Sequence, residues 1–178
     1  MTSDVLAVNE DNEVLETVTR RKAHTKDGIR HMAYTVLVID SQGQGLLAKR
    51  SDEKRLWPGY WDGTVSSHPS DPQDLIGSAS RRLEVELGLD PNQLKRIDCL
   101  DTFEYKAFYR DVGVEWEICS LLVTELDEKR LEPDPSEVAE LRWEPLNNKL
   151  KQRFENYSLL ACPWFEIAFD IILSSEQF

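Results

Sequence analysis

The sequence predicts a single domain of the α/β or α+β sandwich class. Strand-like and helix-like segments alternate along 178 residues, a length that suits one well-buried core. A β-rich run at residues 32–40 shows little polar alternation, as in a strand covered on both faces, and residues 71–88 carry a helical repeat. No internal repeat, low-complexity tract or linker divides the chain. Helices are therefore expected to cover a sheet.

The first part of the chain is predicted to hold four strands. Residues 4–18 form two short strands around a polar turn, and residues 20–31 are a polar connection with two of the three histidines. The buried strand at 32–40 leads through a glycine-rich turn at 41–45 into a partner strand at 46–49. Both of these histidines therefore precede the buried strand.

A loop at residues 57–69, rich in aromatic residues, glycines and hydroxyls, is predicted to form the wall of a pocket. Trp57 and Trp61 supply aromatic surface, and Gly59 allows backbone conformations that other residues resist. His68 lies near the end of the loop. Such a loop can bring the backbone close to a ligand.

Residues 71–88 are predicted to form a helix. Asp71 can cap its start, Pro72 suits the first helical position, and Gly88 suits the stop. Apolar residues recur every four positions, at Leu75, Ala79, Leu83 and Leu87. This repeat gives the helix one face for the core.

Two consecutive strands are predicted at residues 97–109 and 114–124. In the second, Glu115 and Glu117 are two residues apart and lie side by side on one face, opposite Trp116. Adjacent carboxylates repel each other unless a cation or a shared proton lies between them. The pair is therefore a candidate for binding a cation.

The last part of the chain is predicted to contain three helices and one strand. A short helix starts at Asp134, an edge strand follows at 141–144, a helix covers 147–156, and Cys162-Pro163 opens a final helix. The apolar stripe expected on this final helix consists of Trp164, Ile167, Ile171 and Ile172. Such a stripe most simply faces the core.

Composition argues against several classes of function. The net charge of −12 and the pI of about 4.7 argue against the broad basic surface that nucleic-acid binding needs. The chain lacks an apolar run of about 18 residues that could span a membrane, and its start lacks the features of a secretory signal. Three cysteines without metal-type spacing fit reduced thiols. We therefore expect a cytoplasmic protein.

Seven of the 21 basic residues of this acidic chain lie in two short stretches, residues 20–22 and 49–55. An anionic small molecule would need such clusters in an acidic protein. Solvated loops have the same composition, so charge alone leaves both interpretations open.

Five residues on three separate segments form a possible metal-ligand set, here called the ligand cluster: His24, His31, His68, Glu115 and Glu117. Imidazoles mixed with carboxylates would suit Zn²⁺, Mn²⁺ or Fe²⁺ better than Mg²⁺, which prefers oxygen ligands. Since single histidines are more often structural, the residues alone leave both roles open. Arg82 and Glu86 share a helix face, where Glu86 offers a separate oxygen ligand for Mg²⁺ bridged to phosphate.

A series of short motifs runs in order through nearly the whole chain, from about residue 5 to about residue 173: Ala23-His-Thr, Arg30-His-Met-Ala, Trp57-Pro-Gly-x-Trp, His68-Pro, Arg81-Arg82…Glu86-Leu-Gly88, Glu115-x-Glu117 and Pro163-Trp164. Together they resemble the type I isopentenyl-diphosphate isomerase family. The resemblance implies one Nudix-like domain over residues 1–178, a mixed-sheet α/β/α sandwich. It also implies a metal-dependent enzyme that adds and removes protons at a carbon–carbon double bond of an isoprenoid diphosphate.

The resemblance further implies roles for individual residues. The ligand cluster would hold one divalent metal (Zn²⁺, Mn²⁺ or Mg²⁺), and Glu86 would help to hold Mg²⁺ on the substrate diphosphate. The diphosphate contacts match Arg20, Arg50, Lys54 and Arg82. Tyr105 matches a tyrosine that assists proton transfer, and Trp164 a tryptophan whose π face stabilises a carbocation. Glu117 matches the acid/base that works with a cysteine on the opposite side of the double bond.

The chain departs from the family at that cysteine, because its position holds Ser66. A thiol with a pKa near 8.5 exchanges protons near neutrality, whereas an alkyl hydroxyl is a far weaker acid. Gly63 replaces a family asparagine and is expected to make room, and Asp62 adds a carboxyl beside the pocket. These changes favour an altered reaction, such as cyclisation of a longer prenyl diphosphate started by protonation.

Three alternatives stay open. The chain could be a true isopentenyl-diphosphate isomerase, with Ser66, Asp62 or a water in the cysteine's role, or a variant inactivated by substitution at Ser66. It could also be a Nudix diphosphate hydrolase, although the hydrolase motif retains only one arginine, Glu86 and Gly88. Finally, it could be a catalytically dead module that binds a prenyl diphosphate.

Overall fold

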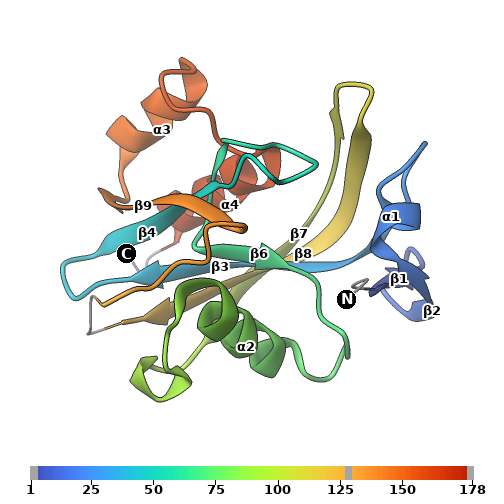
Figure 1. Cartoon of the computed structure of the whole chain (residues 1–178), viewed down its shortest axis with the longest axis horizontal. Helices are drawn as coiled ribbons and strands as arrows, with labels where there is room; N and C mark the ends of the chain where they lie inside the picture. Colours follow the sequence, from blue (N-terminus) through green and yellow to red (C-terminus); the bar gives the residue numbers. More distant parts are fainter. Residues whose placement is uncertain (1–3, 127–129, 176–178) are drawn as a thin grey trace.

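The computed structural model describes residues 4–126 and 130–175, which form one mixed sheet covered by helices (Figure 1). The strands are β1 Asp4–Val8, β2 Val14–Thr19, β3 His31–Ile39, β4 Gln44–Arg50, β5 Trp61–Asp62, β6 Val65–Ser67, β7 Asp98–Tyr109, β8 Gly113–Glu125 and β9 Val138–Pro145. The helices are α1 Arg20–Ala23, α2 Leu75–Leu87, α3 Asn148–Glu155 and α4 Pro163–Ser174, with a 3₁₀ turn at Pro91–Gln93. The predicted strands at 4–18, 32–40, 46–49, 97–109 and 114–124 are confirmed.

Strand β3 is the hub of the sheet. It pairs antiparallel with β1, β4 and β6 and parallel with β8, in a register that sets His31 opposite Glu117. Strand β7 pairs antiparallel with β8, and β9 pairs antiparallel with β4. The sheet is therefore mixed, as the family resemblance implied, and β6 and β8 both border β3.

Side chains of β3 alternate between two buried layers, as expected for a strand covered on both faces. Tyr34 and Val36 belong to the core that packs against α2, and Leu37 and Ile39 belong to the core that contains the aromatic residues of α4. Helix α2 lies on one side of the sheet, and α3 and α4 lie on the other (Figure 1). The expected α/β/α sandwich is confirmed.

Helix α2 begins later than predicted. Its first residue is Leu75 rather than Pro72, because the Asp71 carboxylate accepts a hydrogen bond from the Gln73 amide and closes a local turn instead of capping a helix. The predicted stop is confirmed, since Gly88 takes a left-handed conformation with φ of 65°.

The short helix predicted from Asp134 is wrong. The Asp134 carboxylate accepts hydrogen bonds from the amide and hydroxyl of Ser136, which forms a turn. The chain then enters β9 at Val138 because the edge of β4 offers unpaired backbone groups. The edge strand predicted at 141–144 is present and extends over Val138–Pro145.

The apolar face predicted for the last helix is only partly correct. In α4 the fully buried side chains include Phe165, Ala168 and Phe169, while Ile167 is 37% exposed and Ile171 is half-buried. Trp164 and Ile172 are buried as predicted. The aromatic residues of α4 take the central positions because they fill the space over the sheet beside Phe154 of α3.

Gly63 does not make room, contrary to the expectation from sequence, because its environment is already filled. A Cβ atom at this position would lie 2.6 Å from Thr35 Cγ2 and 3.0 Å from the Val36 carbonyl oxygen. The glycine instead lets the loop between β5 and β6 approach β3 closely. This approach brings Asp62 and Ser66 close to Thr35.

We expect Gly63→Ala to lower the free energy of unfolding by about 1–3 kcal/mol, because the added methyl overpacks a filled site. Urea denaturation monitored by circular dichroism would measure the loss. Thr35→Ser removes the methyl group that the new Cβ meets first, so it should recover part of the stability in the double variant. If the two losses simply add, the close approach is not what requires glycine.

Candidate active site

Four elements bring the ligand cluster together. His24 follows α1, His31 opens β3, His68 follows β6, and Glu115 and Glu117 lie in β8. The parallel pairing of β3 with β8 sets His31 beside Glu117, and the pairing of β3 with β6 carries His68 to the same end of the sheet. One ligand atom from each of the five residues lies within 4.8 Å of all the others. The structure thus assembles all five predicted side chains, and four of them are buried.

Glu117 lies at the centre of the ligand cluster. Its Oε1 atom is 3.1 Å from Nε2 of His31, 2.9 Å from Nε2 of His68 and 3.9 Å from Nε2 of His24. Nε2 of His24 is in turn 2.7 Å from Oε2 of Glu115. Every imidazole therefore directs the same ring nitrogen toward the carboxylate pair.

The donor set fits a divalent cation. His31 Nδ1 lies 2.6 Å from the Ile29 carbonyl oxygen, to which it can only donate, so Nε2 either carries a proton that it donates to Glu117 or, when the ring is neutral, has a lone pair. That lone pair faces the Glu117 oxygen and, at 3.1 Å, Nε2 of His24. Opposed lone pairs need a proton or a metal between them. Three imidazoles and two carboxylates are ligands that Zn²⁺ and Mn²⁺ accept.

The pKa values of the two carboxyls in the ligand cluster are shifted in opposite directions. Burial and the charge of Glu117 raise the pKa of Glu115. Burial also acts to raise the pKa of Glu117, but hydrogen bonds from His31 and His68 hold that pKa well below its usual range. Burial lowers the pKa of His68 to about 3, so this ring is neutral and can act as a ligand at neutral pH.

Tyr105 and Trp164 extend the site from the ligand cluster. The Tyr105 hydroxyl donates to Oε2 of Glu117 at 2.5 Å, and burial raises the pKa of this phenol well above its usual value, so it stays a donor. The ring of Trp164 lies 5.7 Å from the Tyr105 ring and 5.1 Å from Trp57, which meets it edge-on at 87°. Arg50 lies 5.3 Å over the Trp164 ring.

Ser66 shares a small cavity with these groups. The cavity, here called the inner cavity, has a volume of about 20 Å³ and is lined by all four residues expected to be catalytic: Ser66, Tyr105, Glu117 and Trp164. The Ser66 hydroxyl lies 2.8 Å from Thr35 Oγ1, 2.9 Å from Asp62 Oδ1 and 3.3 Å from Trp164 Nε1. Among the described residues, no cysteine lines this cavity. The buried thiol of Cys119 contacts Thr35 Oγ1 at 3.8 Å, and Thr35 is not among the residues that line the cavity.

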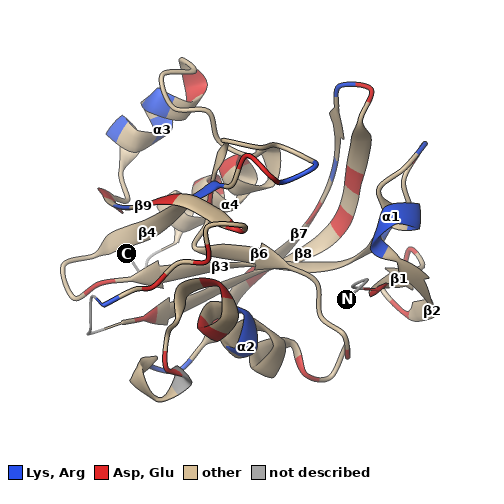
Figure 2. Cartoon of the chain, viewed as in Figure 1, with Lys and Arg blue, Asp and Glu red and all other residues tan. Residues whose placement is uncertain are grey.

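A larger basic cleft of about 790 Å³ opens beside the inner cavity. Its basic residues are Arg20, Arg21, Arg50, Lys54 and Arg55. Arg20, Arg50 and Glu115 line both spaces, so the cleft leads to the ligand cluster. Figure 2 shows the basic helix α1 and the acidic positions of β8 in the same part of the molecule.

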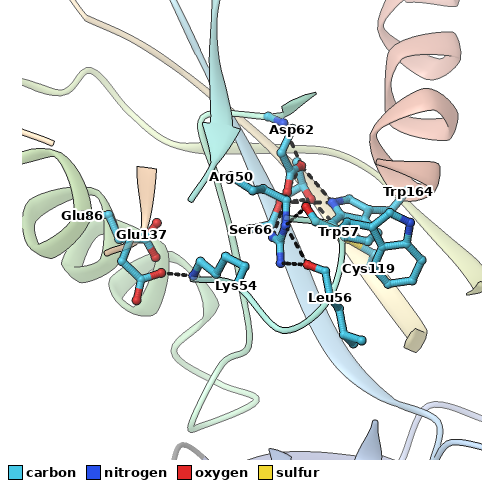
Figure 3. A network of polar contacts seen from close by, with 12 residues as sticks. Arg50, Lys54, Leu56, Trp57, Asp62, Ser66, Glu86, Cys119, Glu137 and Trp164 are labelled. Carbon is cyan, nitrogen blue, oxygen red and sulfur yellow. Dashed lines mark hydrogen bonds and ion pairs between the residues drawn. The ribbon is translucent and has the colours of Figure 1, made fainter. Parts of the chain in front are cut away.

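The four residues expected to contact the diphosphate lie in different environments. Arg20 and Lys54 line the cleft directly. Arg50 also lines the cleft, but its side chain is only 11% exposed and its guanidinium donates to the carbonyl oxygens of Leu56 and Trp57 (Figure 3). Arg82 lies outside the residues that line the cleft and pairs with Glu86 on α2. These four residues therefore do not form one continuous surface in this structure.

Glu86 lies outside the ligand cluster. It is buried and paired with Arg82, and burial raises its pKa. Glu137, which no sequence signal predicted, lines the basic cleft and pairs with Lys54 (Figure 3). Its Oε2 atom lies 3.6 Å from Arg82. No motif marks Glu137, because the turn before β9 alone brings it to this place.

The loop at residues 57–69 contributes to the site differently from the prediction. Trp57 and Trp61 are 3% and 4% exposed and belong to the hydrophobic core, so they support the site from behind rather than forming the pocket wall. Ser66, Ser67 and His68, from the end of this loop, line the inner cavity.

Comparison with known proteins shows the family to which the chain belongs. A model of the Nudix domain matches residues 29–163, and a solved Deinococcus radiodurans structure superposes with a TM-score of 0.75, at 18% identity over 95% of this chain and 99% of that one. The chain is thus a Nudix-fold protein.

It is 46% identical to the Haloarcula marismortui "Isopentenyl-diphosphate Delta-isomerase", over 93% of this chain and 88% of that protein. A Halobacterium salinarum protein of the same name is 43% identical over 94% of this chain and 78% of its own length. The chain belongs to the isopentenyl-diphosphate Delta-isomerase family.

Proposed function

We propose that the protein is a metal-dependent isomerase that moves the double bond of isopentenyl diphosphate to the allylic position. The observation that carries this proposal is the inner cavity, in which Glu117, Tyr105, Trp164 and Ser66 meet beside the ligand cluster. A strong acid/base, an aromatic face and a hydroxyl around one small space suit an alkene that becomes a carbocation. Relatives named for this reaction support the assignment.

Different residues of the chain perform substrate binding, proton transfer and stabilisation of the cation. Arg20 and Lys54 in the basic cleft bind the diphosphate and leave the hydrocarbon end to enter the inner cavity. Glu117 exchanges a proton with one carbon of the double bond, and Tyr105, hydrogen-bonded to it, orients the carboxyl. The π face of Trp164 stabilises the positive charge that develops between the two proton transfers.

Two cation sites belong to the proposal. A divalent metal (Zn²⁺, Mn²⁺ or Mg²⁺) held by the ligand cluster would supply positive charge that offsets the repulsion between the two buried carboxylates. Glu86 would hold Mg²⁺ together with the substrate diphosphate, once Arg82 turns from Glu86 to the phosphates.

Ser66 favours one competing function, the cyclisation of a longer prenyl diphosphate started by protonation. A hydroxyl in place of a thiol weakens the second proton transfer and would let the cation react onward. Two observations weigh against cyclisation: Gly63 adds no space beside the inner cavity, and the relatives reported above are named for the isomerase. The five-carbon isomerase is therefore the preferred function.

Product analysis separates the possible functions. Purified protein with Mg²⁺ and Mn²⁺ would be incubated in turn with isopentenyl, geranyl, farnesyl and geranylgeranyl diphosphates, followed by gas chromatography of the dephosphorylated products. The allylic five-carbon isomer supports the proposal, and a cyclic product from a longer substrate supports the cyclase. Released phosphate would indicate a hydrolase, and tight binding without turnover a binding module.

Ser66→Cys should raise kcat for five-carbon isomerisation by about tenfold or more, because a thiol exchanges protons near neutrality more readily than a hydroxyl. Ser66→Ala, which has no exchangeable proton, is the matched control and should lower kcat. Steady-state kinetics on isopentenyl diphosphate would measure both. An unchanged rate for Ser66→Cys would mean that proton transfer at this position does not limit turnover.

A further inference from the structure

Asp62 is a buried carboxyl outside the expected catalytic, diphosphate-binding and metal-ligand residues, and the sequence offered it only as one of three groups that could act in place of the family cysteine. It ends β5, is 3% exposed, and lies next to the inner cavity without belonging to the ligand cluster. Burying a carboxylate is costly unless partners compensate it. The groups that contact the Asp62 carboxylate therefore indicate its role.

All the short contacts of Asp62 fall on one oxygen. Oδ1 accepts hydrogen bonds from the Ser66 hydroxyl at 2.9 Å, the Trp164 indole at 2.8 Å and the Gly63 amide at 2.7 Å. Oδ2 faces Arg50 at 3.5 Å. Figure 3 shows Asp62, Ser66 and Trp164 converging in this network. A single oxygen thus contacts two of the residues that line the inner cavity.

The three hydrogen bonds to Oδ1 do not by themselves require a charged group. An asparagine could accept the same three hydrogen bonds through its amide oxygen without placing an anion in the core. Ser66 also has a second polar partner in Thr35, so the hydroxyl would not be left unpaired. The negative charge pairs with Arg50 through Oδ2, and Oδ1 is left to accept the Ser66 hydroxyl proton. Burial raises the pKa of Asp62 despite these donors, which makes the carboxylate a better proton acceptor.

We propose that Asp62 acts through Ser66 as the proton acceptor of the isomerisation, so that the pair takes the place of a thiol. This inference rests on the proposed function. While the protonated form of Glu117 gives a proton to the terminal carbon of the double bond, a C–H bond of the methylene next to the other alkene carbon breaks and the electron pair of that bond forms the new double bond. The released proton goes to Ser66 Oγ as the Ser66 hydroxyl proton moves to Asp62 Oδ1. One proton has left Glu117 and one has reached Asp62. Before the next turnover Asp62 releases its proton through Ser66 and Glu117 takes one up from solvent, and the reverse reaction runs the same transfers backward.

The arrangement of the strands supports this division of roles. Ser66 comes from β6 and Glu117 from β8, and both strands border β3 while their two side chains line the inner cavity. The hydroxyl of Ser66 is the part of the pair that can touch substrate. Asp62 lies behind it, so Asp62 is a positioning residue whose charge acts through Ser66.

The test is a double-mutant cycle with Asp62→Asn and Ser66→Cys, using kcat and KM for isopentenyl diphosphate. In the wild-type background, Asp62→Asn should lower kcat by about 10²-fold, with KM changed by less than about threefold. In the Ser66→Cys background, where the thiol exchanges protons itself, the same change should lower kcat by less than about threefold. A purely structural Asp62 would cause equal losses in both backgrounds, and that result would overturn the proposal.

A second pair of variants keeps the test decisive if Asp62→Asn folds poorly. Ser66→Ala should lower kcat about as much as Asp62→Asn, and combining the two should cost no more than either alone, because both interrupt one transfer. Additive losses would contradict the relay. Full wild-type activity in Asp62→Asn would reject Asp62 and leave the isomerase intact. Absence of isomer from both the wild type and Ser66→Cys would reject the isomerase together with the relay.

Discussion

Glu117→Gln should lower kcat for isopentenyl diphosphate by about 10²- to 10⁴-fold, the range that removal of a general acid/base typically costs. The amide keeps the shape of the side chain but cannot exchange the proton that the reaction moves. It also puts either an amide NH₂ or a weaker acceptor against Nε2 of His31 and His68, which now contact one carboxylate oxygen. Steady-state kinetics at saturating substrate would measure the loss.

The matched control is Glu115→Gln, two residues along the same face of β8. Glu115 contacts His24 but neither Tyr105 nor His68, so its loss should weaken metal binding more than proton transfer. Raising the concentration of Mn²⁺ or Zn²⁺ should therefore restore much of the activity of Glu115→Gln and little of that of Glu117→Gln. Equal rescue of both variants would show that Glu117 only binds metal.

Much of the scaffold could be predicted because its signals are local. An apolar run between a polar segment and a turn identifies β3, and a two-residue spacing places Glu115 and Glu117 on one face of β8. Both signals depend only on the alternation of side chains along a strand. The convergence of His24, His31 and His68 could not be derived this way, since it depends on which strands pair. The motif order of a known family supplied that information.

The incorrect predictions concern residues whose conformation depends on tertiary partners. Asp134 and the residues after it have the sequence of a helix start, yet the following residues pair with β4 and form β9. Gly63 looked like a widening of the pocket because sequence does not show that Thr35 already fills that space. Glu137 reaches the basic cleft only through the turn before β9. In each case a contact between distant segments decides the outcome.

Removing divalent cations with a chelator should abolish isomerisation and lower the midpoint of thermal unfolding, because the ligand cluster buries two carboxylates against each other. A cation present at about 100 times its dissociation constant stabilises the native state by about 2.7 kcal/mol. For a chain of this size that corresponds to a shift of about 5–11 °C. Zn²⁺ and Mn²⁺ should restore the midpoint better than Mg²⁺, since three of the ligands are imidazoles.

Two variants distinguish the ligand cluster from other cation sites in this experiment. His68→Gln removes one imidazole and should shrink the shift caused by Zn²⁺, whereas Glu86→Gln, whose carboxyl lies outside the cluster, should leave that shift intact. The shift should also shrink as the pH falls, because protons compete with the cation for imidazole and carboxylate lone pairs. A midpoint that does not respond to Zn²⁺ or Mn²⁺ would mean that the five side chains are held together by shared protons. Catalysis would then have to proceed without a metal at this site.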